Sequence, residues 1–402
     1  MRKITKSSYL FNKYPKVTIS IFIIFVLITI DFIGTLAFNR FYPKAWKERV
    51  HEKLGVQDEI ISHTFIPNGE YYSKSYDVFT NSLGFKDYKV REIDLNRDKR
   101  LLIMGDSFTE GVWLSWENTF PGMIADSLIK LDIEVLNAGV ASYSPFIHWK
   151  KLEYLVKDVG LRLNSLVVFI DISDISNEID YREEYEKNAS FLIENKIKKS
   201  KQLNNFLDNE KKDLKTKIVK LLKYNFIFFH NLSDLIYDLI RSSSIHKTSL
   251  MEKINKVPWW MDRNHFHSNW PLKTKDSWQK KIDHGQSLME KSMDNIIAIC
   301  TKENIDVTIA VYPWPNSILF NDFYSEHIKN WNLYCKNRDI KFLNLYPSFF
   351  EPDMSQLERK KIINSNYIRH DFHFNAVGHR KIANEYIKHF NNFHNFSSET
   401  TP

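Results

Sequence analysis

The sequence predicts an α/β fold, a three-layer α/β/α sandwich with about five parallel strands, together with an N-terminal transmembrane helix and a helical insertion. Three observations predict it. Short apolar runs alternate with longer segments of helical spacing between residues 100 and 390, which is typical of βαβ units around a parallel sheet. An apolar run of 22 residues lies near the N-terminus. Of the 402 residues, 43% are hydrophobic and 26% are charged, which supports a sizeable core and excludes wholesale disorder.

Each predicted strand is a short, mostly apolar run that ends at a turn, and each predicted helix repeats apolar residues at helical spacing. The strands are expected at 100–105, 133–136, 165–170, 307–312 and 341–345. The helices between them are expected at 118–131, 146–159, 288–303, 326–338 and 376–390. This order places helices on both faces of one parallel sheet.

Five segments are expected along the chain. They are a basic N-terminal tail (1–16), a transmembrane helix (17–38), a juxtamembrane connector (39–98), an α/β domain (99–392) and a C-terminal tail (393–402). Within the domain, residues 176–262 break the alternation, because they are rich in Lys, Asn, Asp and Glu and contain amphipathic stretches at 214–224 and 232–240. We interpret 176–262 as a helical insertion whose charge runs lie on solvated helix faces.

The net charge of +7 belongs to the flanks of the apolar segment, since residues 1–49 account for all of it. The remaining chain is formally neutral, so no nucleic-acid partner is expected. Two cysteines, Cys300 and Cys335, exclude a disulfide framework, a four-cysteine zinc site and an iron–sulfur site.

The segment 17–38 is long enough to cross a bilayer as a helix. Its fifteen Val, Ile, Leu and Phe residues contribute about −4 to −9 kcal/mol to insertion, against about +3 kcal/mol for Asp31. A cleaved signal peptide is the alternative, but no clear small-x-small cleavage site follows. Lys and Arg are nearly balanced on the two sides. The short N-terminus favours a cytoplasmic start, which predicts a single-pass membrane protein with its domain outside the cytoplasm.

The first predicted strand ends in Gly105-Asp106-Ser107. Ligands of open parallel sheets bind beyond the carboxyl ends of the strands, so the Ser107 hydroxyl is expected at a ligand-binding edge. The start of the following helix offers N–H groups to an oxyanion. For an isolated Gly-Asp-Ser, a helix cap is the preferred interpretation.

A second polar cluster lies near the C-terminus, where Asp371 stands two residues before His373. An aspartate at that spacing can orient the imidazole and leave its other nitrogen free as a base. A lone Asp-x-His is more often a polar loop. Its occurrence together with the Ser107 motif, both at strand ends of one sheet, favours a catalytic set.

With these motifs the sequence resembles the SGNH/GDSL hydrolase superfamily, over most of residues 76–392 and with the helical insertion unexplained. Gly105-Asp106-Ser107 with Gly111 is similar to the block that carries the nucleophile. The stretch 137–144 is similar to the block whose glycine, here Gly139, lends an N–H to the oxyanion hole. Asp371 and His373, followed by Asn375 and Gly378, are similar to the last block. The stretches 81–85 and 312–315 resemble segments of membrane-anchored members whose substrates are uncertain. The resemblance implies a flavodoxin-like sheet.

Two features depart from the family pattern. The block that usually reads Gly-x-Asn-Asp is here Asp171-Ile172-Ser173-Asp174, so Ser173 replaces the oxyanion asparagine or the third donor is missing. Such a loss costs on the order of 3 kcal/mol of transition-state binding. The aspartate also stands two rather than three residues before the histidine, as in members that act on polysaccharide acetyl groups.

The resemblance implies Ser107 as nucleophile, His373 as base and Asp371 as its orienting partner. The expected oxyanion hole consists of Ser107, Gly139 and Ser173, and Asp174 and Trp314 are expected to contact the substrate. No metal and no cofactor are expected. A metal site formed by the histidines at 265, 267, 370 and 373 is the weaker alternative, because their spacing fits no helix-borne ligand pair.

The predicted function is removal of a small acyl group, most plausibly acetyl, from an extracytoplasmic glycan through an acyl-serine intermediate. Two alternatives stay open. One is an O-acyltransferase of the same fold. The other is a non-catalytic envelope or polysaccharide-assembly protein that retains the fold, which the missing asparagine at position 173 favours.

Overall fold

The computed structural model describes residues 14–41, 54–58, 61–73, 76–195, 259–273, 275–369 and 371–393. The chain divides into two compact units. One comprises Met1–Lys47 and Leu192–Lys256, and the other comprises Glu48–Phe191 and Val257–Pro402. The first unit contains the N-terminal helix, and the second contains the α/β sheet.

The N-terminal helix α2 runs from Pro15 to Phe41 and contains the predicted segment 17–38. Its stretch Pro15–Gly34 is long and apolar enough to cross a membrane. Large apolar side chains are exposed along it, with Phe22 and Phe25 each 66% exposed. Asp31 is an acidic residue within this apolar stretch and is 4% exposed. An apolar surface on all sides of a helix is suited to lipid rather than to water.

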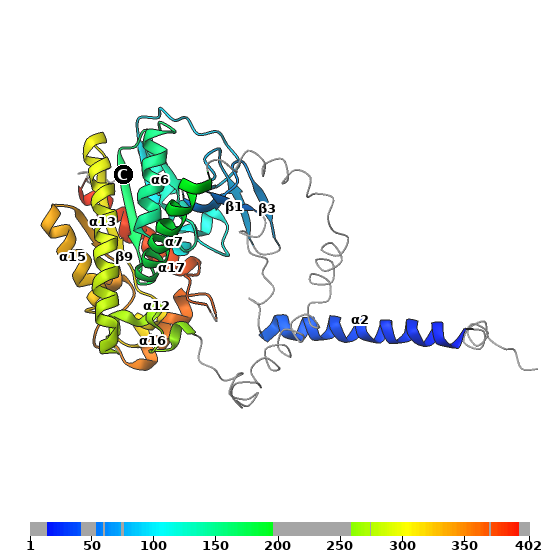
Figure 1. The fold of residues 1–402 in the computed structure, drawn as a ribbon. Coiled ribbons are helices and arrows are strands. Elements are labelled where there is room, and N and C mark those ends of the chain that lie inside the picture. The colour runs from blue at the N-terminus through cyan, green and yellow to red at the C-terminus, as the bar shows by residue number, and fades with distance from the viewer. Residues whose placement is uncertain are drawn as a thin grey trace, which may run out of the picture. The chain divides into compact units, whose positions relative to one another are not determined.

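The α/β unit, which Figure 1 shows as a ribbon, is built on a sheet. This sheet has eight strands in the order β10-β9-β8-β6-β7-β5-β4-β3. The strands from β10 to β7 are parallel. They are β6 (Arg100–Met104), β7 (Glu134–Asn137), β8 (Ser165–Ile170), β9 (Asp306–Val311) and β10 (Lys341–Asn344). The prediction of five parallel strands is confirmed, and each strand lies within one residue of its expected range.

The expectation of a connector at 39–98 is wrong for its described residues. Strands β3 (Glu70–Tyr72), β4 (Asp77–Thr80) and β5 (Lys86–Asp87) extend the sheet in antiparallel fashion. A separate hairpin, β1 (Gly55–Asp58) and β2 (Ser62–Phe65), precedes them. Strands of two to four residues with mixed polarity leave no readable alternation in the sequence, so this extension was missed.

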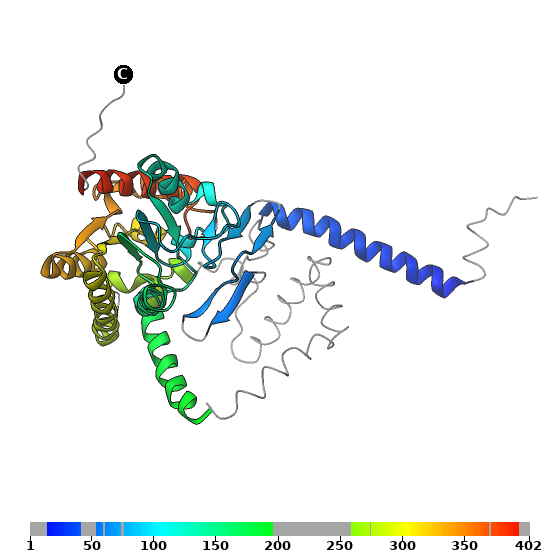
Figure 2. The ribbon, with the colours of Figure 1, turned by 90° about the horizontal axis from the view of Figure 1, so that it is seen from above.

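Helices cover both sides of the sheet (Figure 2). Helix α5 (Phe120–Leu128) packs on α17 (Ala376–Phe393), and α6 (Pro145–Lys157) packs on α13 (Gln279–Glu303). Helix α15 (Glu326–Arg338) contacts β9 and β10. The predicted three-layer sandwich is therefore confirmed. Short helices connect these elements: α4 (Ser107–Glu110), η1 (Trp116–Asn118), η2 (Ile129–Leu131), α14 (Pro315–Leu319), η8 (Tyr346–Ser348) and α16 (Gln356–Asn366).

The expected insertion at 176–262 is described only at its ends. Helix α7 (Asp174–Asn195) begins directly after β8, two residues before the expected start of the insertion. The predicted helices at 214–224 and 232–240 lie outside the described residues. The chain is described again at η5 (Trp259–Met261), α12 (Phe266–Asn269), η6 (Trp270–Leu272) and η7 (Asp276–Trp278).

The parallel strands form the centre of the core. All five residues of β6 are buried, and so are Leu166–Ile170 of β8. Strands covered by helices on both faces read as continuous apolar runs, which explains why they could be located from the sequence. A smaller cluster joins the β1–β2 hairpin to the segment after β7, through Phe65, Tyr143 and Phe146.

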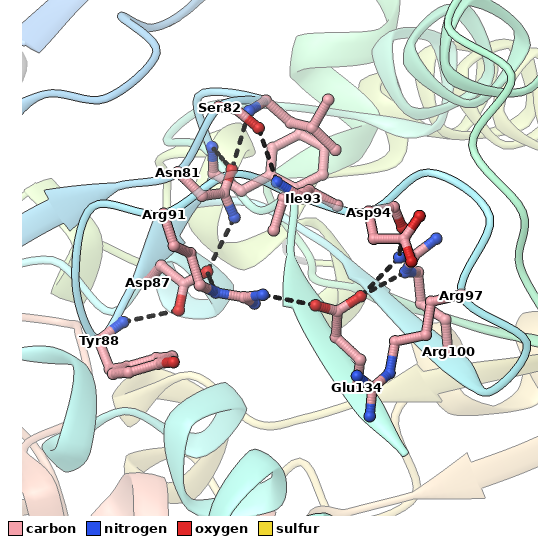
Figure 3. A network of polar contacts seen from close by, with 12 residues as sticks. Asn81, Ser82, Asp87, Tyr88, Arg91, Ile93, Asp94, Arg97, Arg100 and Glu134 are labelled. Atoms are coloured by element: carbon pink, nitrogen blue, oxygen red, sulfur yellow. Dashed lines mark hydrogen bonds and ion pairs between the residues drawn. The ribbon is translucent and has the colours of Figure 1, made fainter. Parts of the chain in front are cut away.

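A buried ionic network fixes the antiparallel extension to the parallel sheet (Figure 3). Glu134 of β7 accepts from Arg100 of β6, at 2.7 Å from Nε, and from Arg91. Arg91 also pairs with Asp87 of β5 at 2.9 Å. The side chain of Arg100 has no exposed surface, so the charge of Glu134 is needed to offset its desolvation. The network ties three adjacent strands together at one end of the sheet.

The stretch 81–85, singled out in the sequence, forms a turn in this extension. Asn81 Oδ1 accepts from the N–H groups of Leu83 and Phe85 at 3.0 and 3.2 Å, and Asn81 Nδ2 donates to Asp87 at 2.9 Å. The turn places Lys86 directly in β5, beside Asn137 of β7. The segment therefore organises the strand from which Lys86 reaches the Ser107 loop.

Candidate active site

Ser107 opens the turn that follows β6. It is the first residue of the four-residue helix α4, and the Asp106 side chain caps this helix by accepting from Phe108 N at 2.9 Å. Gly111 ends it with φ 69°, a left-handed conformation that favours glycine. Because α4 has only one turn, individual N–H groups rather than a helix dipole are the donors it can offer. Ser107 is 9% exposed, which leaves its hydroxyl at the edge of the protein surface.

The structure brings Ser107, His373 and Asp371 together. His373 Nε2 lies 2.8 Å from Ser107 Oγ, and His373 Nδ1 lies 2.7 Å from Asp371 Oδ1. The Asp371 side chain is fully buried, and that of His373 is 12% exposed. Asp371 cannot donate when ionised, so the Nδ1–H tautomer is the one that satisfies both contacts. Nε2 then accepts from the Ser107 hydroxyl, which is the arrangement a general base requires.

The loop around Asp371 is held by its own backbone. Asp371 Oδ1 also accepts from the N–H groups of Phe372 and His373, at 2.6 and 3.2 Å. Tyr367 and Phe374 form an antiparallel bridge across the loop, and Ile368 N donates to His373 O at 2.9 Å. Asp371 and His373 therefore stand two residues apart in a tight turn. One carboxylate oxygen of Asp371 accepts both from the backbone of this turn and from the imidazole of His373.

Asn375 and Gly378, also singled out in the sequence, start helix α17. Asn375 Oδ1 accepts from Val377 N and Gly378 N at 2.9 and 3.1 Å, and its Nδ2 donates to Tyr367 O at 3.2 Å. Asn375 therefore caps α17 and also links this helix to Tyr367, at the start of the loop. The role of these residues is to fix the loop that carries His373.

Aromatic rings surround the imidazole. The ring centroids of Phe372 and Phe108 lie 4.1 and 5.0 Å from that of His373. Phe108 also contacts Phe374 at 4.9 Å. The turn that begins at the predicted nucleophile Ser107 (the nucleophile turn) and the loop that carries Asp371 and His373 (the histidine loop) therefore pack on each other directly. These contacts fix the ring plane of His373 and keep water away from one side of it.

Gly139 lies against α4. A Cβ at this position would stand 2.6 Å from Thr109 Cγ2 and 2.8 Å from Glu110 N, so only glycine fits. Its N–H donates to Asn137 Oδ1 at 3.0 Å. The predicted oxyanion donor is therefore beside the nucleophile turn, and in this conformation it is bonded to a side-chain amide.

Ser173 is turned away from the role expected of it. Both its N–H and its hydroxyl donate to Asp171 Oδ1, each at 2.6 Å. Ser173 is 4% exposed. The prediction that its hydroxyl replaces the oxyanion asparagine is not supported by this conformation, because that hydrogen is already donated to Asp171.

Three carboxylates meet below the nucleophile turn. Oxygen atoms of Asp106, Asp171 and Asp174 lie within 4.8 Å of one another, and all three residues are buried. Burial and the neighbouring acids raise the pKa values of Asp106 and Asp174 well above the usual range. Within the described part of the chain, this is the one group of three His, Cys, Asp or Glu residues close enough to share a metal ion. Side chains donate hydrogen bonds to two of these carboxylates. Tyr312 OH lies 3.0 Å from Asp106 Oδ1, and Trp314 Nε1 lies 2.8 Å from Asp171 Oδ2.

Asp174 and Trp314, which were expected to contact the substrate, are buried in this structure. Asp174 has no exposed surface and Trp314 is 1% exposed. The Trp314 ring stacks on Phe372, with centroids 4.5 Å apart and an angle of 12° between the planes. Both residues follow strands at the ligand-binding edge, as expected, but their side chains point into the core. Phe372 rather than Trp314 lies against His373.

Within the described part of the chain, His265, His267 and His373 do not form a group close enough to share a metal ion. The ring centroids of His265 and His267 are 6.3 Å apart, and His267 packs against Trp314. His370 lies outside the described residues. The Pro-Trp-Pro stretch 313–315 contributes backbone contacts to the fold. Tyr367 OH donates to Pro313 O at 2.8 Å, and Pro315 begins α14.

Three buried charges near the site were missed by sequence reasoning. Lys86 Nζ donates to Gly111 O and Leu114 O at 2.9 and 2.6 Å, and Glu110 Oε2 accepts from Ala141 N at 2.9 Å. Burial lowers the pKa of Lys86 to about 8. On the opposite side of the Gly139 segment, Lys151 Nζ donates to Ala138 O at 3.0 Å. In the sequence these lysines stand next to other charged residues, and nothing marks them as buried.

No family model and no curated protein matches this sequence. Among solved structures, it is similar to the psychrotrophic esterase EstA from Pseudoalteromonas sp., with 9% identity, a TM-score of 0.34, and coverage of 74% of this chain and 100% of that one. It is also similar to a lipolytic G-D-S-L family member from Veillonella parvula, with 11% identity, a TM-score of 0.35, and coverage of 72% and 97%. A catalytic mutant of Axe2, an acetylxylan esterase from Geobacillus stearothermophilus, matches with 9% identity, a TM-score of 0.34, and coverage of 74% and 95%. At these values the similarities do not assign the chain to a family.

Proposed function

We propose that this protein is a serine esterase that cleaves a small acyl ester through an acyl-Ser107 intermediate. The observation that carries the proposal is the unbroken chain of contacts from Ser107 Oγ through His373 to Asp371, with distances of 2.8 and 2.7 Å. A nucleophile, a base and a group that orients the base are the three parts that acyl transfer to serine requires.

The reaction begins with attack of Ser107 Oγ on the ester carbonyl, while His373 Nε2 takes the hydroxyl proton. Asp371 stabilises the imidazolium that forms. The tetrahedral intermediate collapses, the C–O bond of the ester breaks, and the leaving alkoxide takes the proton from His373. Water, activated by the same imidazole, then adds to the acyl-serine and releases the acid. An acceptor hydroxyl in place of water gives acyl transfer.

The proposed substrate is an acetylated glycan outside the cytoplasm. Two observations support a small acyl group and a membrane-bound location. Ser107 is only 9% exposed and aromatic rings crowd His373, which leaves little space beside the nucleophile. Helix α2 is apolar over a length that can cross a bilayer once.

The test uses the full-length protein in detergent with p-nitrophenyl acetate and a fluorophosphonate probe. We expect turnover and labelling by the wild type, and loss of both in Ser107→Ala and His373→Ala. Ser348→Ala is a matched control, since Ser348 lies in η8, outside the proposed triad. Labelling that persists in Ser107→Ala would refute the nucleophile assignment.

A non-catalytic role is the second candidate. It is favoured by the two expected oxyanion donors that are bonded internally, Gly139 to Asn137 and Ser173 to Asp171. If neither short-chain esters nor the probe react in a Ser107-dependent manner, this role replaces the esterase. If acyl-Ser107 forms but turns over only when a glycan hydroxyl is supplied, the protein is an acyltransferase.

A further inference from the structure

A buried lysine holds the peptide group that carries the predicted oxyanion donor. Lys151 belongs to α6, is 2% exposed, and donates from Nζ to Ala138 O at 3.0 Å. Lysine is almost never fully buried, because desolvation of the ammonium group is costly. The burial of Lys151 therefore needs an explanation. The carbonyl that it contacts, Ala138 O, belongs to the same peptide group as the Gly139 N–H.

The contact sets the direction of the Gly139 N–H. The described residues contain no cis peptide bond, so the Ala138–Gly139 peptide is trans and planar. In a trans peptide the carbonyl and the following N–H point in opposite directions. By holding Ala138 O on one side, Lys151 directs the Gly139 N–H to the other side, where Asn137 Oδ1 accepts it at 3.0 Å.

Neighbouring contacts keep this peptide beside the nucleophile turn. Ala138 N donates to Ile103 O at 2.8 Å, and Val140 N donates to Gly105 O at 3.2 Å, two residues before Ser107. Gly139 itself lies against Thr109 and Glu110 of α4, closely enough to exclude a Cβ. The peptide is thus aligned along the segment that carries the proposed nucleophile.

We propose that Lys151 is a positioning residue that fixes and polarises the Ala138–Gly139 peptide, so that the Gly139 N–H can stabilise the oxyanion formed when Ser107 attacks an ester. The inference rests on the proposed function. A positive charge on the carbonyl oxygen draws electron density through the peptide and strengthens the N–H as a donor. The developing oxyanion carries a full charge, so it competes for this hydrogen against the neutral amide of Asn137.

The surroundings of Lys151 make its charge depend on pH near neutrality. The rings of Phe85 and Tyr143 lie 5.0 and 4.9 Å from Nζ, and His148 lies one turn before it on α6. Burial lowers the pKa of Lys151 to about 7, while the carboxylates of Asp58 and Glu110 act in the opposite direction. His148 stays neutral, since burial lowers its pKa to about 3. The charged form of Lys151 is therefore lost as the pH rises through about 7.

The test compares Lys151→Met and Lys151→Arg with the wild type, as full-length proteins in detergent with p-nitrophenyl acetate. Methionine keeps the length of the side chain without the charge, and arginine keeps the charge at every pH. We expect kcat to fall roughly 10- to 100-fold in Lys151→Met with little change in KM, a smaller effect than the loss of a whole oxyanion donor. In Lys151→Arg we expect kcat to persist at alkaline pH where wild-type kcat declines.

Lys381→Met is the matched control. Lys381 also donates from Nζ to a backbone carbonyl, Ser348 O at 3.2 Å, but it lies on α17 outside the triad and the oxyanion segment. We expect its kcat and pH profile to equal those of the wild type. Circular dichroism of each variant identifies any that does not fold, and if Lys151→Met is one of these, the pH profile of Lys151→Arg decides.

The outcomes separate the two proposals. If Ser107→Ala abolishes turnover but Lys151→Met keeps wild-type kcat, the role of Lys151 is wrong and the esterase stands. The same holds if Lys151→Arg and the wild type share one alkaline profile. If the wild type shows no Ser107-dependent turnover or labelling, the proposed function fails and the role of Lys151 fails with it.

Discussion

Ser107 Oγ and His373 Nε2 lie 2.8 Å apart although 266 positions separate the two residues in the chain. The parallel sheet makes this contact, because it brings the loop after its first parallel strand and the loop before its last helix to the same edge. The histidine loop then presents one nitrogen to the serine and the other to Asp371.

Replacing Asp371 by asparagine tests the tautomer that this contact requires. The amide cannot act as the anionic acceptor of Nδ1–H, so His373 would more often carry its proton on Nε2 and lose its function as a base. We expect kcat for p-nitrophenyl acetate to fall by roughly 10³- to 10⁴-fold, with KM nearly unchanged. Asp353→Asn is the control, since Asp353 is exposed. A kcat within a few-fold of the wild type would remove Asp371 from the mechanism.

Gly139→Ala tests the close approach of the Gly139 segment to α4. The added Cβ would lie 2.6 Å from Thr109 Cγ2 and 2.8 Å from Glu110 N, so the backbone must move. We expect a loss of about 1–3 kcal/mol in the free energy of unfolding and a large loss of esterase activity. Urea unfolding and p-nitrophenyl acetate turnover measure the two effects.

Gly160→Ala provides the comparison for this variant. Gly160 has φ 76° but a Cβ there would meet nothing within 4 Å, so only backbone strain is introduced. We expect a loss of roughly 1–2 kcal/mol in stability with activity retained. If Gly139→Ala behaves like Gly160→Ala in both assays, the segment does not constrain the active site.

The buried carboxylates of Asp106, Asp171 and Asp174 (the acid cluster) predict a stability that decreases as pH rises. Burial and the carboxylates of Asp171 and Asp106 raise the pKa of Asp174 well above 3.8. The folded state therefore holds a proton that the unfolded chain releases, and the associated stability is full below about 3.8 and is lost as the pH rises through the folded-state pKa. Asp174→Asn keeps the shape of the protonated group without the titration. We expect its melting temperature to fall less than that of the wild type between pH 5 and pH 9.

Glu290→Gln is a suitable control for this pH series, because Glu290 lies on α13 outside the acid cluster and accepts from Gln286 at 2.9 Å. Its melting temperatures should follow those of the wild type at each pH. Parallel curves for Asp174→Asn and the wild type would show that Asp174 is ionised in the folded protein.

The ionic network at the other end of the sheet predicts a large effect of Glu134→Gln. This change leaves Arg91 and the fully buried Arg100 without their shared carboxylate (Figure 3). Removing one partner of a buried pair costs about 3–5 kcal/mol, because an uncompensated charge remains. Asp132→Asn is a nearby control, since its pair with Arg97 is exposed, with 79% of the Asp132 side chain accessible. Equal stabilities of the two variants in urea unfolding would contradict a stabilising role of the network.

The sequence predicted the parts of the fold that are buried on both sides. Strands such as β8 are continuous apolar runs, because helices cover both of their faces, and that pattern is visible without a structure. The antiparallel strands β3 to β5 were missed for the opposite reason. They are short, mix polar and apolar residues, and are held by partners such as Glu134 that lie far along the chain.

The sequence also predicted the residues of the candidate site, Ser107 from its position at the end of a predicted strand, and Asp371 and His373 from their spacing. It could not give their orientation. Trp314 and Asp174 follow strands at the correct edge, yet their side chains are buried and contact the acid cluster rather than solvent. Lys151 stands beside Lys150 in the sequence, and only the packing of α6 shows that the first is buried and the second is not.

The order of residues alone thus determined an apolar N-terminal helix, five parallel strands and the identities of a serine, a histidine and an aspartate at one sheet edge. Only the tertiary structure decided which groups face each other: the 2.8 Å contact of His373 with Ser107, the inward turn of Ser173, and the contact of Lys151 with Ala138 O. The physical reason is that the spacing of apolar residues in the sequence indicates which face of a single helix or strand is buried. Hydrogen bonds between distant segments depend instead on how the helices and strands pack together.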